Sequence, residues 1–92
     1  MNLSHFAGEA GGAYDSGRNG VTNAFNSPFW YLDQMALFAA GGHKSFCRQT
    51  LVGGWYGLLN VTGFEPTPDY YSLLLWSRLM GPGVLSAQVW SG

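Results

Sequence analysis

The sequence predicts an α/β protein with parallel strands, and two observations lead to this fold class. Segments with polar residues at helical spacing alternate with short segments rich in β-branched and aromatic residues. Glycine and proline clusters separate these segments. Of the 92 residues, 47% are hydrophobic and only 10% are charged, so few polar side chains are available to cover the apolar ones. We therefore expect an incomplete domain that is a piece of something larger.

The first half of the chain predicts a loop followed by a helix. Residues 8–20 contain five glycines together with Asp, Ser and Asn, which favour turns. Polar residues recur at helical spacing from Phe25 to Ala40. Because proline is tolerated only in the first helical turn, the helix should begin at Ser27 or Pro28, and it should end at the two glycines that follow Ala40.

The second half repeats the alternation. A strand is expected over Lys44–Val52, followed by a long loop over Gly53–Pro68. The next helix should cover Tyr70–Met80 with Asp69 as its N-cap, and it is apolar on nearly every side, as is typical of helices buried between layers. Val84–Trp90 is expected to form a final strand.

These elements are too few to close an α/β fold. A (β/α)₈ TIM barrel takes roughly 250 residues, so a chain of 92 residues has the length of about its last quarter.

Glu9 is the first carboxylate to consider for chemistry. It lies in Gly-Glu-Ala-Gly-Gly, where small neighbours leave space for a ligand to approach the backbone. The alternative interpretation is an ordinary solvated loop glutamate. The other acids have structural explanations as a helix cap, a helix surface residue, a turn residue and a loop residue: Asp69, Asp33, Asp15 and Glu65. Of these four acids, only Asp15 is expected near the site, because its loop continues from the segment that carries Glu9.

Other chemistries have no motif behind them. The glycine-rich loop lacks both phosphate-binding patterns. A triad of Ser16, His43 and Asp33 has no nucleophile elbow, and Cys47 is expected to be a buried structural thiol. The chain has only four Lys and Arg residues, too few to form the basic face that binds nucleic acid.

We expect no metal and no cofactor. We also expect no signal peptide and no transmembrane span.

Four blocks of sequence carry a family resemblance. In this order and spacing, GEAGGAYDSGRNGVTNAF, SPFWYLDQM, CRQTLVGGWYGLLN and PDYYSLLLWSRLMGPGVL resemble the heparanase-like proteins of plants. These proteins belong to the glycoside hydrolase family of heparanase and related β-glucuronidases. The resemblance covers about residues 8–90. It implies a retaining β-glucuronidase in which residues 1–82 form the C-terminal portion of a (β/α)₈ barrel and residues 83–92 start the first strand of a C-terminal β-sandwich.

The resemblance also implies roles for individual residues. Glu9 corresponds to the nucleophile at the end of the seventh barrel strand, and Gly54 and Tyr56 to a Gly-x-Tyr motif near the eighth. From the chemistry of the mechanism, we expect the Tyr56 hydroxyl to orient the Glu9 carboxylate by donating a hydrogen bond. The implied substrate-binding residues are Asp15, Ser16, Gly17, Gln49 and Gly54. Trp55 is a further candidate from its own chemistry, because an aromatic loop is either a platform for sugar stacking or ordinary packing. The chain departs from the family pattern at Trp55, where relatives carry Asn, and in residues 1–7, which lack the apolar and Trp residues that lead into Gly-Glu. The family's acid/base glutamate lies in an upstream Asn-Glu pair, and this chain has no such pair.

Three functions are therefore weighed. The first is a fragment of a β-glucuronidase acting on glucuronic-acid-containing polysaccharides or proteoglycans, inactive until joined to the N-terminal half of its barrel. The second is a non-catalytic carbohydrate-binding module that uses the loop with Trp55 and Tyr56, and the third is a structural interaction piece whose apolar helices dock onto a partner. The family resemblance implies a secreted, vacuolar or lysosomal, or peripherally membrane-associated protein.

Overall fold

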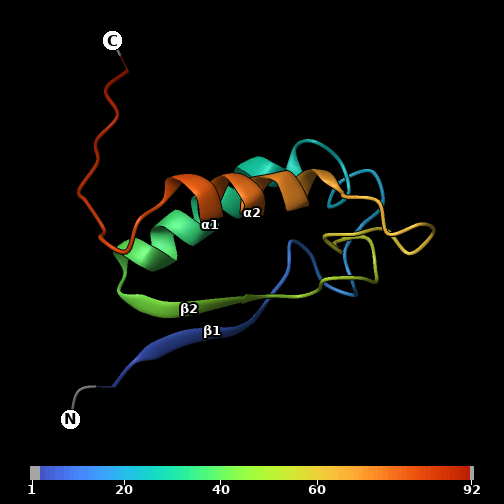
Figure 1. The fold of residues 1–92 in the computed structure, drawn as a ribbon, viewed down its shortest axis with the longest axis horizontal. Helices are drawn as coiled ribbons and strands as arrows, with labels where there is room; N and C mark the ends of the chain where they lie inside the picture. The colour runs from blue at the N-terminus through green and yellow to red at the C-terminus, as the bar shows by residue number, and fades with distance from the viewer. Residues whose placement is uncertain (1–2, 92) are drawn as a thin grey trace.

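A computed structural model describes residues 3–91 and shows a β-α-β-α arrangement (Figure 1). The elements are β1 (His5–Ala10), α1 (Ser27–Ala40), β2 (His43–Arg48) and α2 (Pro68–Leu79). The predicted α/β class is confirmed. Residues 1, 2 and 92, which belong to the ends of the two expected domains, lie outside the described residues.

β1 and β2 pair in parallel, as the alternation of elements predicts. His5 lies opposite His43 and Ala10 lies opposite Arg48, with register shifts between them. Within residues 3–91, each of these strands is bonded to a neighbouring strand along one edge only. The sheet therefore has two open edges.

β1 is the element that the sequence prediction missed, because residues 8–20 were expected to be loop from Gly8 onward. The segment His-Phe-Ala-Gly-Glu-Ala contains neither a β-branched residue nor an alternating pattern. Its pairing with β2, and not its own propensity, makes it a strand. Residues 1–7 do not resemble the family's seventh strand in sequence, yet His5–Ala7 lie within β1.

Both helices lie on the same side of the strand pair and run back against the strand direction (Figure 1). Between the helices and β2 lies a small core centred on Tyr31, Met35 and Leu58. Partly buried aromatic and aliphatic side chains surround it: Trp30, Leu32, Phe46, Tyr70, Leu73 and Trp76. Because side chains alternate across a strand, Phe46 packs towards this core while Cys47 points away. Cys47 is exposed, so the expectation of a buried thiol is wrong.

The observed helix starts agree with the predicted starts to within two residues. α1 begins at Ser27, directly before Pro28, as expected. α2 begins at Pro68 with Thr67 as its N-cap, so Asp69 lies inside the first turn and is not the cap. Proline at the first position explains this shift, because its fixed φ is suited to a helix start.

The chain leaves regular structure earlier than expected after both β2 and α2. β2 ends at Arg48, and Val52 makes only an isolated bridge with Leu59. Residues 81–91 form neither helix nor strand, so the expected strand Val84–Trp90 is wrong for this chain. The described residues offer that segment no strand to pair with.

One side of α2 packs against α1, and the other is open to solvent. Asp69 and Ser72 are buried, whereas Leu75 is 51% and Leu79 is 70% exposed. The prediction that this helix is buried between two layers is therefore not met within the chain. One layer is present and the second is not among the described residues.

Candidate functional site

A pocket of about 410 Å³ opens at the carboxyl ends of the two parallel strands. The loop after β1 and the loop after β2 meet there (Figure 1). Its lining comes from these loops and strand ends: Glu9, Gly11, Ala13, Tyr14, Asp15, Ser16, Gln49 and Tyr56. In folds with parallel strands, ligands bind at this edge of the sheet.

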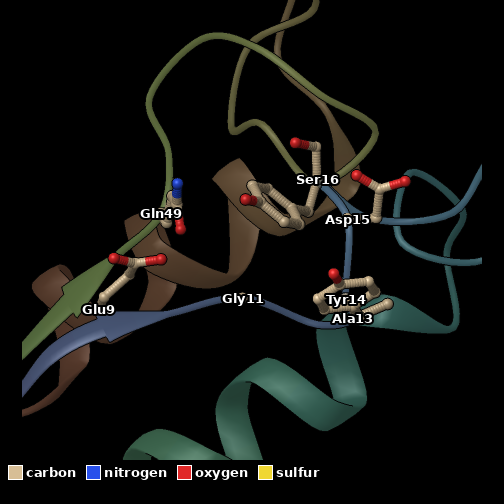
Figure 2. Close-up of a pocket in the computed structure, with 8 residues that line it drawn as sticks. Glu9, Gly11, Ala13, Tyr14, Asp15, Ser16 and Gln49 are labelled. Carbon is tan, nitrogen blue, oxygen red and sulfur yellow. The ribbon is translucent and has the colours of Figure 1, made fainter.

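Glu9 and Gln49 lie next to each other at the carboxyl ends of β1 and β2. Glu9 is the penultimate residue of β1, and Gln49 follows β2 directly. The Gln49 N–H donates a hydrogen bond of 2.8 Å to the Ala10 carbonyl, which fixes the two segments relative to each other. Figure 2 shows the Glu9 carboxylate directed towards Gln49. Both side chains therefore face the same space.

Tyr56 closes the inner side of the pocket and is only 6% exposed. Its ring lies against the backbone of Gly11, where an added Cβ would come within 3.1 Å of a ring carbon. The loop that carries it is held by the Leu58 N–H, which donates to the Thr50 carbonyl at 3.0 Å. The glycine after the Glu9 strand thus lets the aromatic ring approach.

The opposite wall is a turn with unusual backbone geometry. Asp15, Ser16 and Gly17 have φ values of 55°, 64° and 92°, in the left-handed region that costs ordinary residues energy. Asp15 and Ser16 line the pocket, and Figure 2 shows them across from Glu9. Gly17 lies behind the wall, where a Cβ would be 2.8 Å from the Tyr56 nitrogen.

Gly54 and Trp55 support the wall without lining the pocket. Gly54 packs on Ser16, and the Trp55 N–H donates to the Ser16 carbonyl at 2.7 Å. The Trp55 side chain is 50% exposed. Of the eight residues expected at the site, five therefore line one pocket: Glu9, Asp15, Ser16, Gln49 and Tyr56. Tyr14 and Ala13 line it as well and were not singled out in the sequence.

A buried ion pair lies behind the pocket. Arg48 Nη2 is 2.6 Å from Asp69 Oδ2, and the two side chains are 4% and 1% exposed. The Ser27 hydroxyl donates to the same carboxylate oxygen at 3.0 Å. Burial raises the pKa of Asp69, and the hydrogen bond from Ser27 and the charge of Arg48 oppose that rise.

The ion pair could not be found in the sequence. An aspartate in the first turn of a helix is ordinarily a cap or a dipole partner, and its actual partner lies on β2. Tyr31 packs beside the pair, and burial raises the pKa of its hydroxyl.

The other groups considered for chemistry do not meet. His43 lies at the amino end of β2 and stacks on Phe38 with ring centroids 4.5 Å apart. Asp33 is exposed on α1, so no triad with Ser16 forms. Across residues 3–91, no three His, Cys, Asp or Glu side chains gather in a way that would hold a metal ion. No helix in the same stretch is long and apolar enough to cross a membrane.

Comparison with known proteins agrees with the family resemblance. The profile of the glycosyl hydrolase family 79 N-terminal domain matches residues 2–36. The chain is 58% identical to heparanase-like protein 1 of Arabidopsis thaliana over 85 residues, which are 92% of this chain and 16% of that protein. It is 54% identical to baicalin-beta-D-glucuronidase of Scutellaria baicalensis over 82 residues, 89% of this chain and 16% of that protein.

A vertebrate protein matches over the same extent. Heparanase of Gallus gallus is 41% identical over 83 residues, again 89% of this chain and 16% of that protein. The chain thus spans about one sixth of the length of these relatives. Its sequence groups with glycoside hydrolases throughout. Over this segment, the chain is similar to members of glycosyl hydrolase family 79.

Proposed function

We propose that this chain is part of a retaining β-glucuronidase of the heparanase-like type, with Glu9 as its nucleophile. The observation that carries the proposal is the pocket at the carboxyl ends of β1 and β2, where Glu9, Gln49 and Tyr56 converge in a family 79 sequence. The substrates that we propose are polysaccharides or proteoglycans containing glucuronic acid. The names of two relatives, a β-glucuronidase and a heparanase, support this class.

The chemistry needs two carboxyl groups about 5 to 5.5 Å apart. A Glu9 oxygen forms a bond to the anomeric carbon as the bond to the leaving oxygen breaks, and the second group, an acid, gives that oxygen its proton. The same group then takes a proton from water, which displaces Glu9 and restores the carboxylate. We propose that this acid/base lies in the part of the enzyme that precedes the segment.

One proposed feature of the pocket orients the nucleophile, and a second suits the carboxylate of a uronic acid. The Tyr56 hydroxyl is proposed to donate a hydrogen bond to the Glu9 carboxylate and so keep it aimed at the sugar. The left-handed turn at Asp15 and Ser16 is proposed to present backbone N–H groups of residues 11–16 to the sugar's carboxylate, since successive amides in such turns bind anions.

Open strand edges and exposed apolar side chains support the placement of this chain in a larger barrel. The strand pair has open edges, and the outer leucines of α2 are exposed. We propose that residues 1–82 complete a (β/α)₈ barrel with an N-terminal part, and that residues 83–92 pair with a β-sandwich.

A chimera tests the proposal. This chain replaces the 82-residue segment that it matches in baicalin-beta-D-glucuronidase, and hydrolysis of baicalin is measured; we call this protein the family 79 chimera. We expect activity in the chimera and none above background after Glu9→Gln, while the exposed Glu65→Gln serves as the matched control. The sugar product should be released as the β-anomer, observed by NMR at early times. An active Glu9→Gln chimera would exclude Glu9 as the nucleophile.

A second function has one observation in its favour. The Trp55 side chain is half exposed beside the pocket, as expected of a ring on which a sugar stacks. A non-catalytic carbohydrate-binding module predicts that the chain alone folds and binds oligosaccharides saturably, and that Trp55→Ala abolishes this binding. Titration calorimetry with glucuronic-acid-containing oligosaccharides distinguishes the two functions.

A further inference from the structure

The guanidinium of Arg48 contacts three backbone carbonyls as well as its carboxylate partner. Nη1 donates to the Gln49 carbonyl at 2.7 Å and makes a longer contact of 3.4 Å with the Ala10 carbonyl. Nη2 donates to the Tyr56 carbonyl at 2.8 Å and to Asp69 at 2.6 Å. One buried side chain therefore joins β1, the loop after β2 and α2.

These carbonyls belong to the segments that carry the pocket. Ala10 follows Glu9 in the chain, and Gln49 and Tyr56 themselves line the pocket. Backbone hydrogen bonds connect these segments in pairs, from Gln49 to Ala10 and from Leu58 to Thr50. The Arg48 guanidinium contacts all three carbonyls at once, so it links the segments of the pocket floor as a group.

The surroundings of Arg48 hold that group in one orientation. Its guanidinium carbon lies 5.4 Å, 5.0 Å and 5.5 Å from the ring centroids of Trp30, Tyr31 and Tyr56, distances at which cations are attracted to aromatic faces. Asp69 balances the charge from the side of α2. A lysine could keep the charge pair but could not reproduce the rigid fork of donors.

We propose that Arg48 is a positioning residue for the glycosidase pocket: it sets the relative placement of Glu9, Gln49 and Tyr56 through their backbones and does not itself touch the sugar. The inference rests on the proposed function. It separates two roles of the ion pair. Asp69 stabilises the fold by holding α2, whereas Arg48 in addition sets the spacing of the reacting groups.

The difference between these roles can be measured in the family 79 chimera. Because displacements of about 1 Å at a reacting centre can cost about 100-fold in rate, we expect Arg48→Lys to lower kcat by at least about 10-fold with less than about 3-fold change in KM. Asp69→Asn, which leaves the three carbonyl contacts available, should lower the melting temperature but keep kcat within about 3-fold of the parent. Arg78→Lys, on the exposed surface of α2, is the matched control and should change neither.

Arg48→Ala extends the test to rescue. Guanidinium added at tens of millimolar should restore part of the lost kcat, and an equal concentration of ammonium should not. If Arg48→Lys retains the parent kcat, or if its kcat falls only in proportion to its folded fraction, the positioning role is wrong.

Hydrogen exchange keeps this test separate from the proposed function. Arg48→Lys should speed amide exchange in peptides containing Gly11, Gln49 and Tyr56, and should leave exchange in α1 unchanged. An inactive but folded chimera would count against the proposed function alone, and exchange would still decide whether Arg48 fixes the pocket. Unchanged exchange at all three segments would overturn the inference.

Discussion

Gly54 packs directly against Ser16, and this contact joins the loop after β2 to the turn after β1. An added Cβ at Gly54 would lie 2.8 Å from the Ser16 Cβ and closer still to the Ser16 carbonyl oxygen. Gly54 also has a φ of 62°. Position 54 therefore requires glycine for its backbone geometry and for the space that it leaves.

Gly54→Ala should push the two loops apart and deform the pocket. The left-handed backbone costs about 1 to 2 kcal/mol for alanine, and the contact with Ser16 adds about 1 to 3 kcal/mol of overpacking. Urea unfolding of the family 79 chimera measures the loss. Gly20→Ala is the control, because Gly20 has a φ of 75° with open space around it. Equal losses at the two positions would show that the contact with Ser16 is unimportant.

Tyr56→Phe should reduce catalysis without unfolding the protein. The ring fills the space against Gly11, and phenylalanine keeps it. A hydrogen bond to a charged group contributes about 1.5 to 3 kcal/mol, so kcat/KM should fall about 10- to 150-fold. Tyr71→Phe, at a side chain that is 55% exposed, should leave the rate unchanged. Steady-state kinetics with matched melting temperatures make the comparison, and a loss below about twofold would argue against the proposed hydrogen bond between Tyr56 and Glu9.

Asp69 should make stability depend on pH. Its pKa is raised in the folded state above the ordinary value of 3.8, because burial disfavours the charged form. The folded state therefore holds this proton to higher pH than the unfolded state does. The contribution of the group to the free energy of unfolding should fall as pH rises from about 3.8 through the raised pKa.

Denaturant titrations of the chimera and its Asp69→Asn variant, repeated between pH 3.5 and 7.5 (about the range over which a shifted carboxyl titrates), should show this slope. The advantage of the parent over Asp69→Asn should shrink as pH rises through that window. An advantage that grows instead would mean that Arg48 outweighs burial. Asp69→Ala should cost about 3 to 5 kcal/mol at neutral pH, because it leaves Arg48 buried without its partner.

The chain expressed alone should be inactive and loosely packed. Large apolar side chains are exposed along α1, α2 and the C-terminal segment, among them Phe29 at 69%, Leu79 at 70% and Trp90 at 86%. We expect strong binding of a hydrophobic dye and no sharp thermal transition. Near-ultraviolet circular dichroism and calorimetry measure this. A cooperative transition with saturable oligosaccharide binding would instead favour the carbohydrate-binding module.

Local patterns predicted the elements that carry strong local signals. Pro28 and the glycines after Ala40 bound α1 as expected. Phe46, together with β-branched residues that lie beyond the end of β2, identified a strand. β1 was not predicted, because its strand conformation comes from pairing with β2 and not from the sequence His-Phe-Ala-Gly-Glu-Ala itself. The prediction of a strand at Val84–Trp90 was wrong for the opposite reason. The sequence there is strand-like, but it has no strand to pair with among the described residues.

Five of the eight expected site residues lie in one pocket, whereas the contacts that support this pocket were not predicted. The motif around Glu9 and the Arg-Gln and Trp-Tyr segments pointed to five residues that the structure brings together. Asp69 was read as a helix cap because nothing near it in sequence reveals a partner that comes from β2. Long-range ion pairs of this kind depend on topology, which local residue patterns do not encode.

The open edges of the strand pair have a practical consequence for making this protein. A ladder with unused N–H and C=O groups along both edges is a template for other chains, so concentration during refolding would favour aggregates over the native pair. Synthesis of the segment in the same cell as the complementary part of a family 79 enzyme would offer those edges their partners as they form. We therefore expect this co-synthesis to raise the soluble yield of these 92 residues.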